Sequence, residues 1–264
     1  MTALERELIA LVEKTFERPK LLSPSDLDPL RELVGNGALD YALVAAAFHF
    51  VNRVADCLDV DPEALPERLR RFEPLRRLMV RLASLMMARM DLANREYEKS
   101  YEDAVASIAA AIEESGGPTS TEAFAPLRTR PKVIEALELA LEERDQRSVL
   151  DRATLARLQR TVEDALPASR IEAEGFHPRP ADPVEAFAFV GTRYAYRTTA
   201  DMIASLRAEG FDDLGILDLA IAVADANQWA RLHRLIGLAP ELFYVFGRES
   251  ERREPSSASA GAAL

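Results

Sequence analysis

The chain has 264 residues, of which 48% are hydrophobic, and this is enough apolar material to bury a core of its own. Its formal net charge of −11 argues against nucleic acid as a partner, because phosphate binding needs a basic surface. One cysteine, Cys57, excludes any intrachain disulfide and any redox cycle that needs two thiols in one chain.

An all-α fold is predicted, because glycine is scarce and few segments alternate apolar with polar residues. The first helix is indicated by Thr2 and Glu5, which have the spacing of a capping box. Proline, glycine and capping residues place the other boundaries, and Asp151 and Asp212 are expected to cap the helices that follow them. In chain order, the expected helices span residues 4–16, a short segment from Ser23, 38–58, 74–114, 131–145, 151–166, a segment from Pro183, a segment from Thr199 or Asp201, and 213–236.

The helix at 38–58 is apolar nearly all round and is therefore expected at the centre of a bundle. Residues 74–114 predict one very long helix or two helices with a kink. Its apolar stripe indicates a packing or oligomer seam and not a cofactor box; the stripe comprises Leu75, Leu78, Met79, Leu82, Leu85, Met86 and Met90. Prolines and Gly175 predict a loop at 167–183.

A near-repeat links the two ends of the chain. Residues 39–60 align without a gap on residues 217–238. We therefore expect a helix-turn-helix module at 1–66 and again, more complete, within 119–248, joined by a long central helix at 67–118 and followed by a disordered tail at 249–264. The two modules should be related by a pseudo-two-fold axis and pack against the central helix.

The residues that suggest chemistry lie on one face of the helix at 38–58. His49, Asn52, Arg53 and Asp56 are spaced i, i+3, i+4 and i+7, and polar groups on such an apolar helix must be paired. Arg231 occupies the position of Arg53 in the second copy. This match favours a structural role in which each arginine ties a buried helix to a neighbouring carboxylate or carbonyl.

These segments resemble the alkylhydroperoxidase D-like (AhpD-like), or carboxymuconolactone decarboxylase, family. The turn GFDDLGILD at 210–218 and the helix FHFVNRVADCL at 48–58 are similar to its motifs. The resemblance covers residues 1–66 and 183–248, and it implies an AhpD-like helical bundle with an internal repeat. Asp40 and Asp218, which match between the copies, are adequately explained by the helix dipole.

Peroxidase members of that family use a cysteine pair together with a glutamate and a histidine. If His177 is laid on the motif histidine, the two cysteine positions fall on Ala173 and Arg170 and the glutamate position on Leu158. No cysteine follows Cys57, so thiol peroxidase chemistry of the family type is excluded. The chain is expected to keep the scaffold and to have a binding or assembly role.

Two alternatives remain open. A cysteine-independent decarboxylase or lyase would act on a small acidic substrate with His49, Arg53 and His177 as candidate catalytic residues, Arg53 holding the acid. A one-cysteine peroxidase would use Cys57 with an external reductant, although a lone thiol on a buried helix is more typical of a core residue.

No cofactor and no metal are expected, because the three histidines show no metal-ligand spacing. Family members are commonly oligomers, so a homo-oligomer stays open, as does a small acidic ligand. The N-terminus lacks the pattern of a signal peptide, and the apolar run from Tyr41 to Val51 is too short to cross a bilayer. The chain is therefore expected in the cytoplasm, without a membrane partner.

Overall fold

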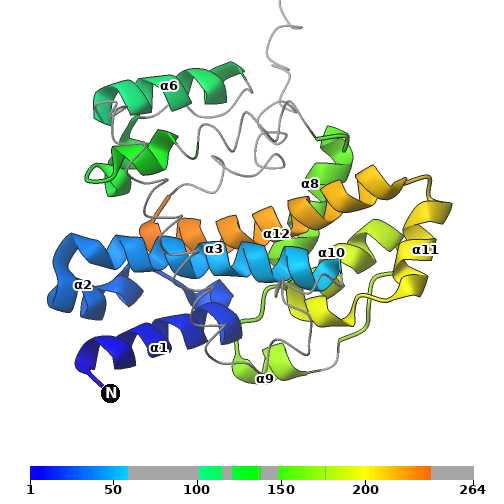
Figure 1. Cartoon of the computed structure of the whole chain (residues 1–264), viewed down its shortest axis with the longest axis horizontal. Helices are drawn as coiled ribbons and strands as arrows, with labels where there is room; N and C mark the ends of the chain where they lie inside the picture. The colour runs from blue at the N-terminus through cyan, green and yellow to red at the C-terminus, as the bar shows by residue number, and fades with distance from the viewer. Residues whose placement is uncertain (59–100, 115–120, 136, 138–147, 176, 239–264) are drawn as a thin grey trace, which may run out of the picture.

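Figure 1 shows the computed structural model of the chain, which describes residues 1–58, 101–114, 121–135, 137, 148–175 and 177–238. Within these ranges the elements are helices and the structure contains no strand, so the all-α prediction is confirmed. The predicted stripe between Leu75 and Met90, the boundaries at 67 and 118, and the tail at 249–264 lie outside the described residues. Of the expected central helix, α6 (Tyr101–Glu114) is described and is helical.

The N-terminal elements begin where their caps predict. Helix α1 (Ala3–Glu17) starts after Thr2, whose hydroxyl accepts a hydrogen bond from Glu5 N at 3.2 Å while Thr2 N donates to the Glu5 carboxylate at 2.7 Å. Gly35 ends the helix at Asp28–Val34 with a positive φ of 58°, which favours glycine. The elements between α1 and the long helix are 3-10 turns at Pro19–Leu21, Pro24–Leu27 and Gly35–Gly37, with α2 at Asp28–Val34; the long helix is α3 (Ala38–Cys57).

Capping residues also set the C-terminal elements. These are α8 (Arg152–Ala165), α9 (Arg170–Glu174), α10 (Pro183–Arg193), a 3-10 turn at Ala195–Arg197, α11 (Ala200–Ala208) and α12 (Asp213–Ile236). Asp151, Thr199 and Asp212 accept the N-terminal amides of α8, α11 and α12, as predicted. The prediction of a loop throughout 167–183 is wrong for α9, which starts at the Ser169 cap.

Helices α3 and α12 form the centre of the fold. They lie side by side and run in opposite directions, with α8 and α10 packed on α12 (Figure 1). Small residues at the crossing let the two helices approach closely: Ala42 and Ala46 of α3 and Ala220 and Ala224 of α12 have no exposed surface. This pair positions the polar residues discussed below.

Helix α3, which was expected to be buried at the centre of a bundle, lies at the centre of the fold but is buried on one side only. Its buried stripe recurs every three or four residues and comprises Ala38, Leu39, Ala42, Ala46, His49, Arg53 and Cys57. Its outer face carries Val44, Phe48 and Val51, which are 58%, 62% and 55% exposed. An apolar composition all round a helix does not require burial all round, because packing on α12 uses one stripe only.

The elements of residues 3–57 and 183–236 follow the same order. In both, a helix is followed by a 3-10 turn, a short helix, a glycine with positive φ (Gly35 or Gly210) and a long helix, and the first segment has further 3-10 turns at Pro24–Leu27 and Gly35–Gly37. The first helices end in nearly the same backbone conformation, with φ −142° and ψ 47° at Arg18 and φ −144° and ψ 47° at Tyr194. The same local geometry therefore recurs in segments that share little sequence.

The matched aspartates have a role beyond the helix dipole. Asp40 accepts two hydrogen bonds from the Arg130 guanidinium, at 2.8 and 3.0 Å, and these bonds lower the pKa of its carboxyl group. Asp218 accepts from Ser148 Oγ at 2.8 Å and from Val149 N at 2.7 Å. Each aspartate thus ties the start of a long helix to a segment from the middle of the chain.

One helical stretch of the described residues, Pro24–Cys57, is long and apolar enough to cross a membrane by length and composition. Core helices of soluble proteins pass the same test, and α3 packs against α12 and carries a buried arginine. The location of the chain stays a prediction.

Candidate functional site

The sequence candidates His49 and Arg53 belong to a closed ring of buried polar residues between α3 and α12. We call it the polar ring, and its members are Thr15, His49, Arg53, Thr192, Asn227 and Arg231. All are at most 8% exposed. Helices α1 and α10 supply the two threonines, and the two long helices supply the other four residues.

Hydrogen bonds fix the tautomer of His49. Arginine can only donate, so the Arg53 Nη1 group, 2.8 Å from His49 Nδ1, makes that ring nitrogen an acceptor. The imidazole proton is then on Nε2, which donates to Thr15 Oγ1 at 3.0 Å. Thr15 gives its own proton to the carbonyl of Val12 at 2.7 Å. Both nitrogens of His49 are therefore occupied.

Asn227 on α12 bonds to an arginine and to a threonine, as His49 on α3 does. Its Nδ2 group donates to Thr192 Oγ1 at 3.0 Å, and the Thr192 hydroxyl donates to the Ala188 carbonyl at 2.8 Å. Its Oδ1 accepts from Arg231 Nη1 at 3.1 Å. The amide of asparagine, like neutral imidazole, offers one acceptor and one donor side, so the two side chains fill equivalent positions.

Each arginine also donates a hydrogen bond to the C-terminal end of another helix, Arg53 to α10 and Arg231 to α1. Arg53 Nη2 on α3 donates to the Thr192 carbonyl at 3.0 Å, and Arg231 Nε on α12 donates to the Thr15 carbonyl at 2.9 Å. Both carbonyls belong to the last turn of a helix, where backbone oxygens have no partner inside the helix and the helix dipole is negative. The carbonyl oxygens at two helix ends thus accept hydrogen bonds from the two buried guanidinium groups, and these bonds complete the polar ring.

Burial sets the protonation states of the ring. Desolvation, with repulsion from Arg231 and Arg53, holds the pKa of His49 far below its ordinary value of 6.5. Burial lowers the pKa of Arg53 to about 10, so its guanidinium is still charged near neutral pH. Phe16 covers the imidazole, with the two ring centroids 4.2 Å apart. His49 is therefore neutral and shielded, with no lone pair left to accept a substrate proton.

The geometry favours a structural role for Arg53 over the holding of an acidic substrate. Nη1 is directed to His49 and Nη2 to Thr192, and only Nε, which is buried, lacks a partner in the described part of the chain. No carboxylate of the described residues bonds to this guanidinium.

His177 lies apart from the polar ring. Its Nε2 atom is 3.0 Å from the Glu172 carbonyl oxygen, on which Arg193 Nη1 also converges at 2.6 Å. Arg193 Nη2 additionally pairs with the Glu172 carboxylate at 2.9 Å. Of the three predicted catalytic residues, the structure brings together His49 and Arg53, while His177 helps to hold the end of α9.

Cys57 lies at the buried end of α3 and is 1% exposed. Burial raises the pKa of its thiol to about 11, against the opposing effects of Arg53 and of a hydrogen bond with Thr198. A Cβ atom placed on Gly191 would approach Cys57 Sγ to 3.0 Å, so the thiol fits closely against α10. The surroundings of this thiol are those of a core side chain.

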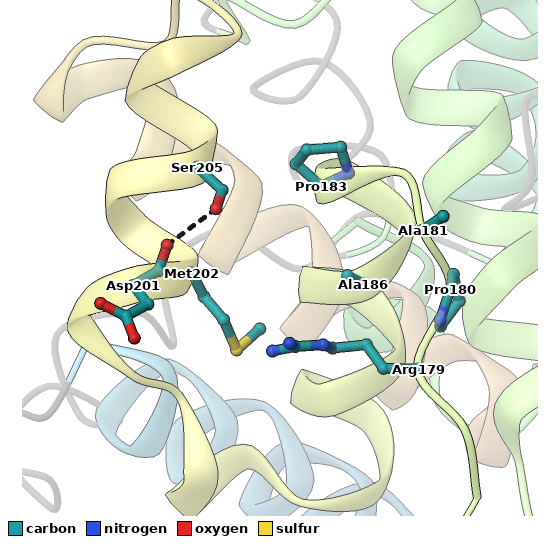
Figure 2. Close-up of a pocket in the computed structure, with 8 residues that line it drawn as sticks. All are labelled: Arg179, Pro180, Ala181, Pro183, Ala186, Asp201, Met202 and Ser205. Atoms are coloured by element: carbon teal, nitrogen blue, oxygen red, sulfur yellow. Dashed lines mark hydrogen bonds between the residues drawn. The ribbon is translucent and has the colours of Figure 1, made fainter.

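A hollow with a volume of about 300 Å³ lies beside α10 (Figure 2). It lies between the loop before α10 and α11, and its lining comprises Arg179, Pro180, Ala181, Pro183, Ala186, Asp201, Met202 and Ser205. In Figure 2 the Arg179 guanidinium points into the hollow toward the Met202 thioether, whereas the Asp201 carboxylate points away from Arg179.

Arg179 did not emerge from the sequence as a candidate. The sequence does carry a local signal at Arg179, because Pro178 and Pro180 flank it and restrict its backbone. What the sequence lacked was the position of α11, which turns an arginine in a proline-rich loop into one wall of a hollow.

Comparisons with protein-family models, with curated proteins and with solved structures found no match to this chain. Among the described residues, no group of three or more histidine, cysteine, aspartate or glutamate side chains could hold a metal ion. Arguments about function therefore rest on the residues themselves.

Proposed function

We propose that this chain is an AhpD-like helical scaffold, built from two copies of one module, that binds or assembles and has no thiol peroxidase chemistry. One observation carries the proposal: two of the side chains that suggested chemistry, His49 and Arg53, are buried and bonded to each other. His49 and Arg53 form their hydrogen bonds within the polar ring, and Cys57 is a core thiol with a raised pKa.

The common order of elements supports the duplication part of this proposal. The matching conformations at Arg18 and Tyr194 and the exchange of arginine bonds between Arg53 and Arg231 are what two copies of one module would produce. In such a duplication, the contact between two subunits of a smaller ancestor becomes a contact within one chain.

A thiol titration tests the absence of peroxidase chemistry. We expect the native protein to leave an aromatic disulfide reagent unreacted and to reveal one thiol per chain after denaturation, because thiolate formation at Cys57 is opposed by burial. Hydrogen peroxide with an external thiol should be consumed no faster than in the absence of protein.

A matched control places the thiol on the outer face of the same helix. The double variant Cys57→Ala, Ala47→Cys keeps one thiol on α3 but at an exposed position, and it should react in the native state. Rapid native labelling of Cys57 itself, or its conversion to a sulfenic acid by peroxide, would refute the proposal.

A further inference from the structure

The hollow between the loop at 179–183 and α11 carries an arginine without a partner. Arg179 forms no hydrogen bond and no ion pair with any residue that the structure describes, although the chain has 44 acidic residues against 33 basic ones. Asp201, the acidic residue of the lining, directs its carboxylate away from Arg179 (Figure 2). The guanidinium therefore keeps its donors available inside the hollow.

The loop that presents Arg179 is anchored at its C-terminal end by Asp182. Asp182 accepts the amides of Val184 and Glu185 at 3.0 Å each as the cap of α10, and its other oxygen pairs with Arg157 Nη1 of α8 at 2.9 Å. Pro180 and Pro183 restrict the backbone on both sides of this cap. The free-energy cost of ordering this anchored segment when a ligand binds Arg179 is therefore small.

Apart from Arg179 and Asp201, the side chains of the lining are apolar, or in the case of Ser205 already bonded. Pro183, Ala186 and Met202 line the hollow with carbon and sulfur, and the Ser205 hydroxyl already donates to the Asp201 carbonyl at 2.8 Å. The volume of about 300 Å³ is at the lower end of the range for small-molecule sites. One cation beside the side chains of Pro183, Ala186 and Met202 suits a small molecule with one anionic group and a short apolar body.

We infer that this hollow binds a small monocarboxylate, whose carboxylate pairs with the Arg179 guanidinium and whose apolar part lies against Met202, Ala186 and Pro183. The negative charge of Asp201 at the rim disfavours a second negative charge on the ligand, which separates a monocarboxylate from phosphate. This inference rests on the proposed binding role, and it moves the recognition of an acidic ligand from Arg53 to Arg179.

Calorimetric titration of the full chain with benzoate and with butyrate tests the inference, with benzamide, butyramide and inorganic phosphate as comparison probes. We expect the carboxylates to bind and the neutral amides and phosphate to bind far more weakly. In Arg179→Gln the carboxylate affinity should fall roughly 10- to 100-fold, the loss typical of a hydrogen bond to a charged group. Arg179→Lys should recover part of it.

Two further variants separate the site from general electrostatics. Arg18→Gln removes the same charge from an exposed arginine outside the hollow and should bind benzoate like the unaltered chain. Ser205→Leu keeps Arg179 but fills the hollow from α11, and it should weaken binding. Both positions are exposed, so thermal unfolding should confirm that every variant folds.

The inference is overturned if no carboxylate binds, if phosphate binds more tightly than benzoate, if Arg179→Gln retains full affinity, or if Arg18→Gln loses as much. These outcomes are independent of the thiol titration, which tests Cys57, a residue outside the lining of the hollow. The failure of the ligand site and the failure of the proposed function are thus distinguishable.

Discussion

Replacement of His49 by asparagine should remove a defined dependence of stability on pH. The folded protein holds His49 neutral, because Nδ1 accepts from Arg53 and burial opposes a further charge between two guanidinium groups. In the unfolded chain the same histidine takes up a proton near its ordinary pKa of 6.5. The unfolded state therefore binds more protons than the folded state below this pH, and stability falls as the pH falls.

The magnitude follows from the linkage relation. A histidine that stays neutral when folded costs about 1.4 kcal/mol of unfolding free energy for each pH unit below its unfolded pKa. Between about pH 7 and pH 5 the loss attributable to His49 is therefore about 2 kcal/mol. The carboxyl groups with lowered pKa values, such as Asp40 and Glu172, lose stabilisation only nearer their ordinary values of 3.8 and 4.5, below most of this window.

Asparagine is the matched substitution, because Asn227 already fills the equivalent position in the other half of the polar ring. It offers an acceptor to Arg53 and a donor to Thr15 but does not titrate. Urea unfolding of both proteins at pH 7, 6 and 5 gives the difference between their unfolding free energies. His177 and His233 are present in both proteins, so their contributions cancel.

We expect the stability advantage of the unaltered chain over His49→Asn to shrink by about 2 kcal/mol across this range. Curves that run parallel from pH 7 to pH 5 would mean that His49 binds its proton in the folded state as well. The assignment of the imidazole proton to Nε2 and the closed polar ring would then be wrong.

Two other substitutions test parts of the fold. Thr192→Val should destabilise the protein by about 1–3 kcal/mol, because one of the two Nδ2 hydrogens of the buried Asn227 loses its acceptor while the other still donates to the Val223 carbonyl at 2.9 Å. The bond from Arg53 to the backbone carbonyl of residue 192 is retained. Chemical unfolding measures the loss, and a change below the error of the method would contradict it. Asp218→Ala should speed amide hydrogen exchange at Val149 with little effect in α12, since it removes the acceptor of that amide; unchanged exchange at Val149 would count against this tie.

Local signals in the sequence predicted the helices well. Thr2 with Glu5, Asp151, Thr199 and Asp212 all cap the helices expected of them, because a cap depends on residues two or three positions away. The short helix α9 was missed although Ser169 caps it locally, since so short a segment has little helical stability of its own and is also held by Arg193 of α10.

The candidate site was predictable only in part. The i, i+4 spacing of His49 and Arg53 placed them together, and the match with Arg231 indicated a structural role. The partners, however, are backbone carbonyls of α1 and α10, and every residue has a carbonyl, so no side-chain pattern could reveal which ones accept. Sequence likewise could not place Arg179 beside α11, because that contact depends on how α10 and α11 pack.

The use of helix ends in place of carboxylates explains how α3 and α12 can each bury an arginine. A buried guanidinium needs a compensating negative charge or dipole, and the last turns of α1 and α10 supply carbonyl oxygens that lack partners within their helices. Arg53 satisfies the end of α10, and Arg231 satisfies the end of α1. Loss of either arginine would leave a buried carbonyl unpaired in the opposite half. Each half therefore completes the other, which makes the polar ring a device that holds the two halves together.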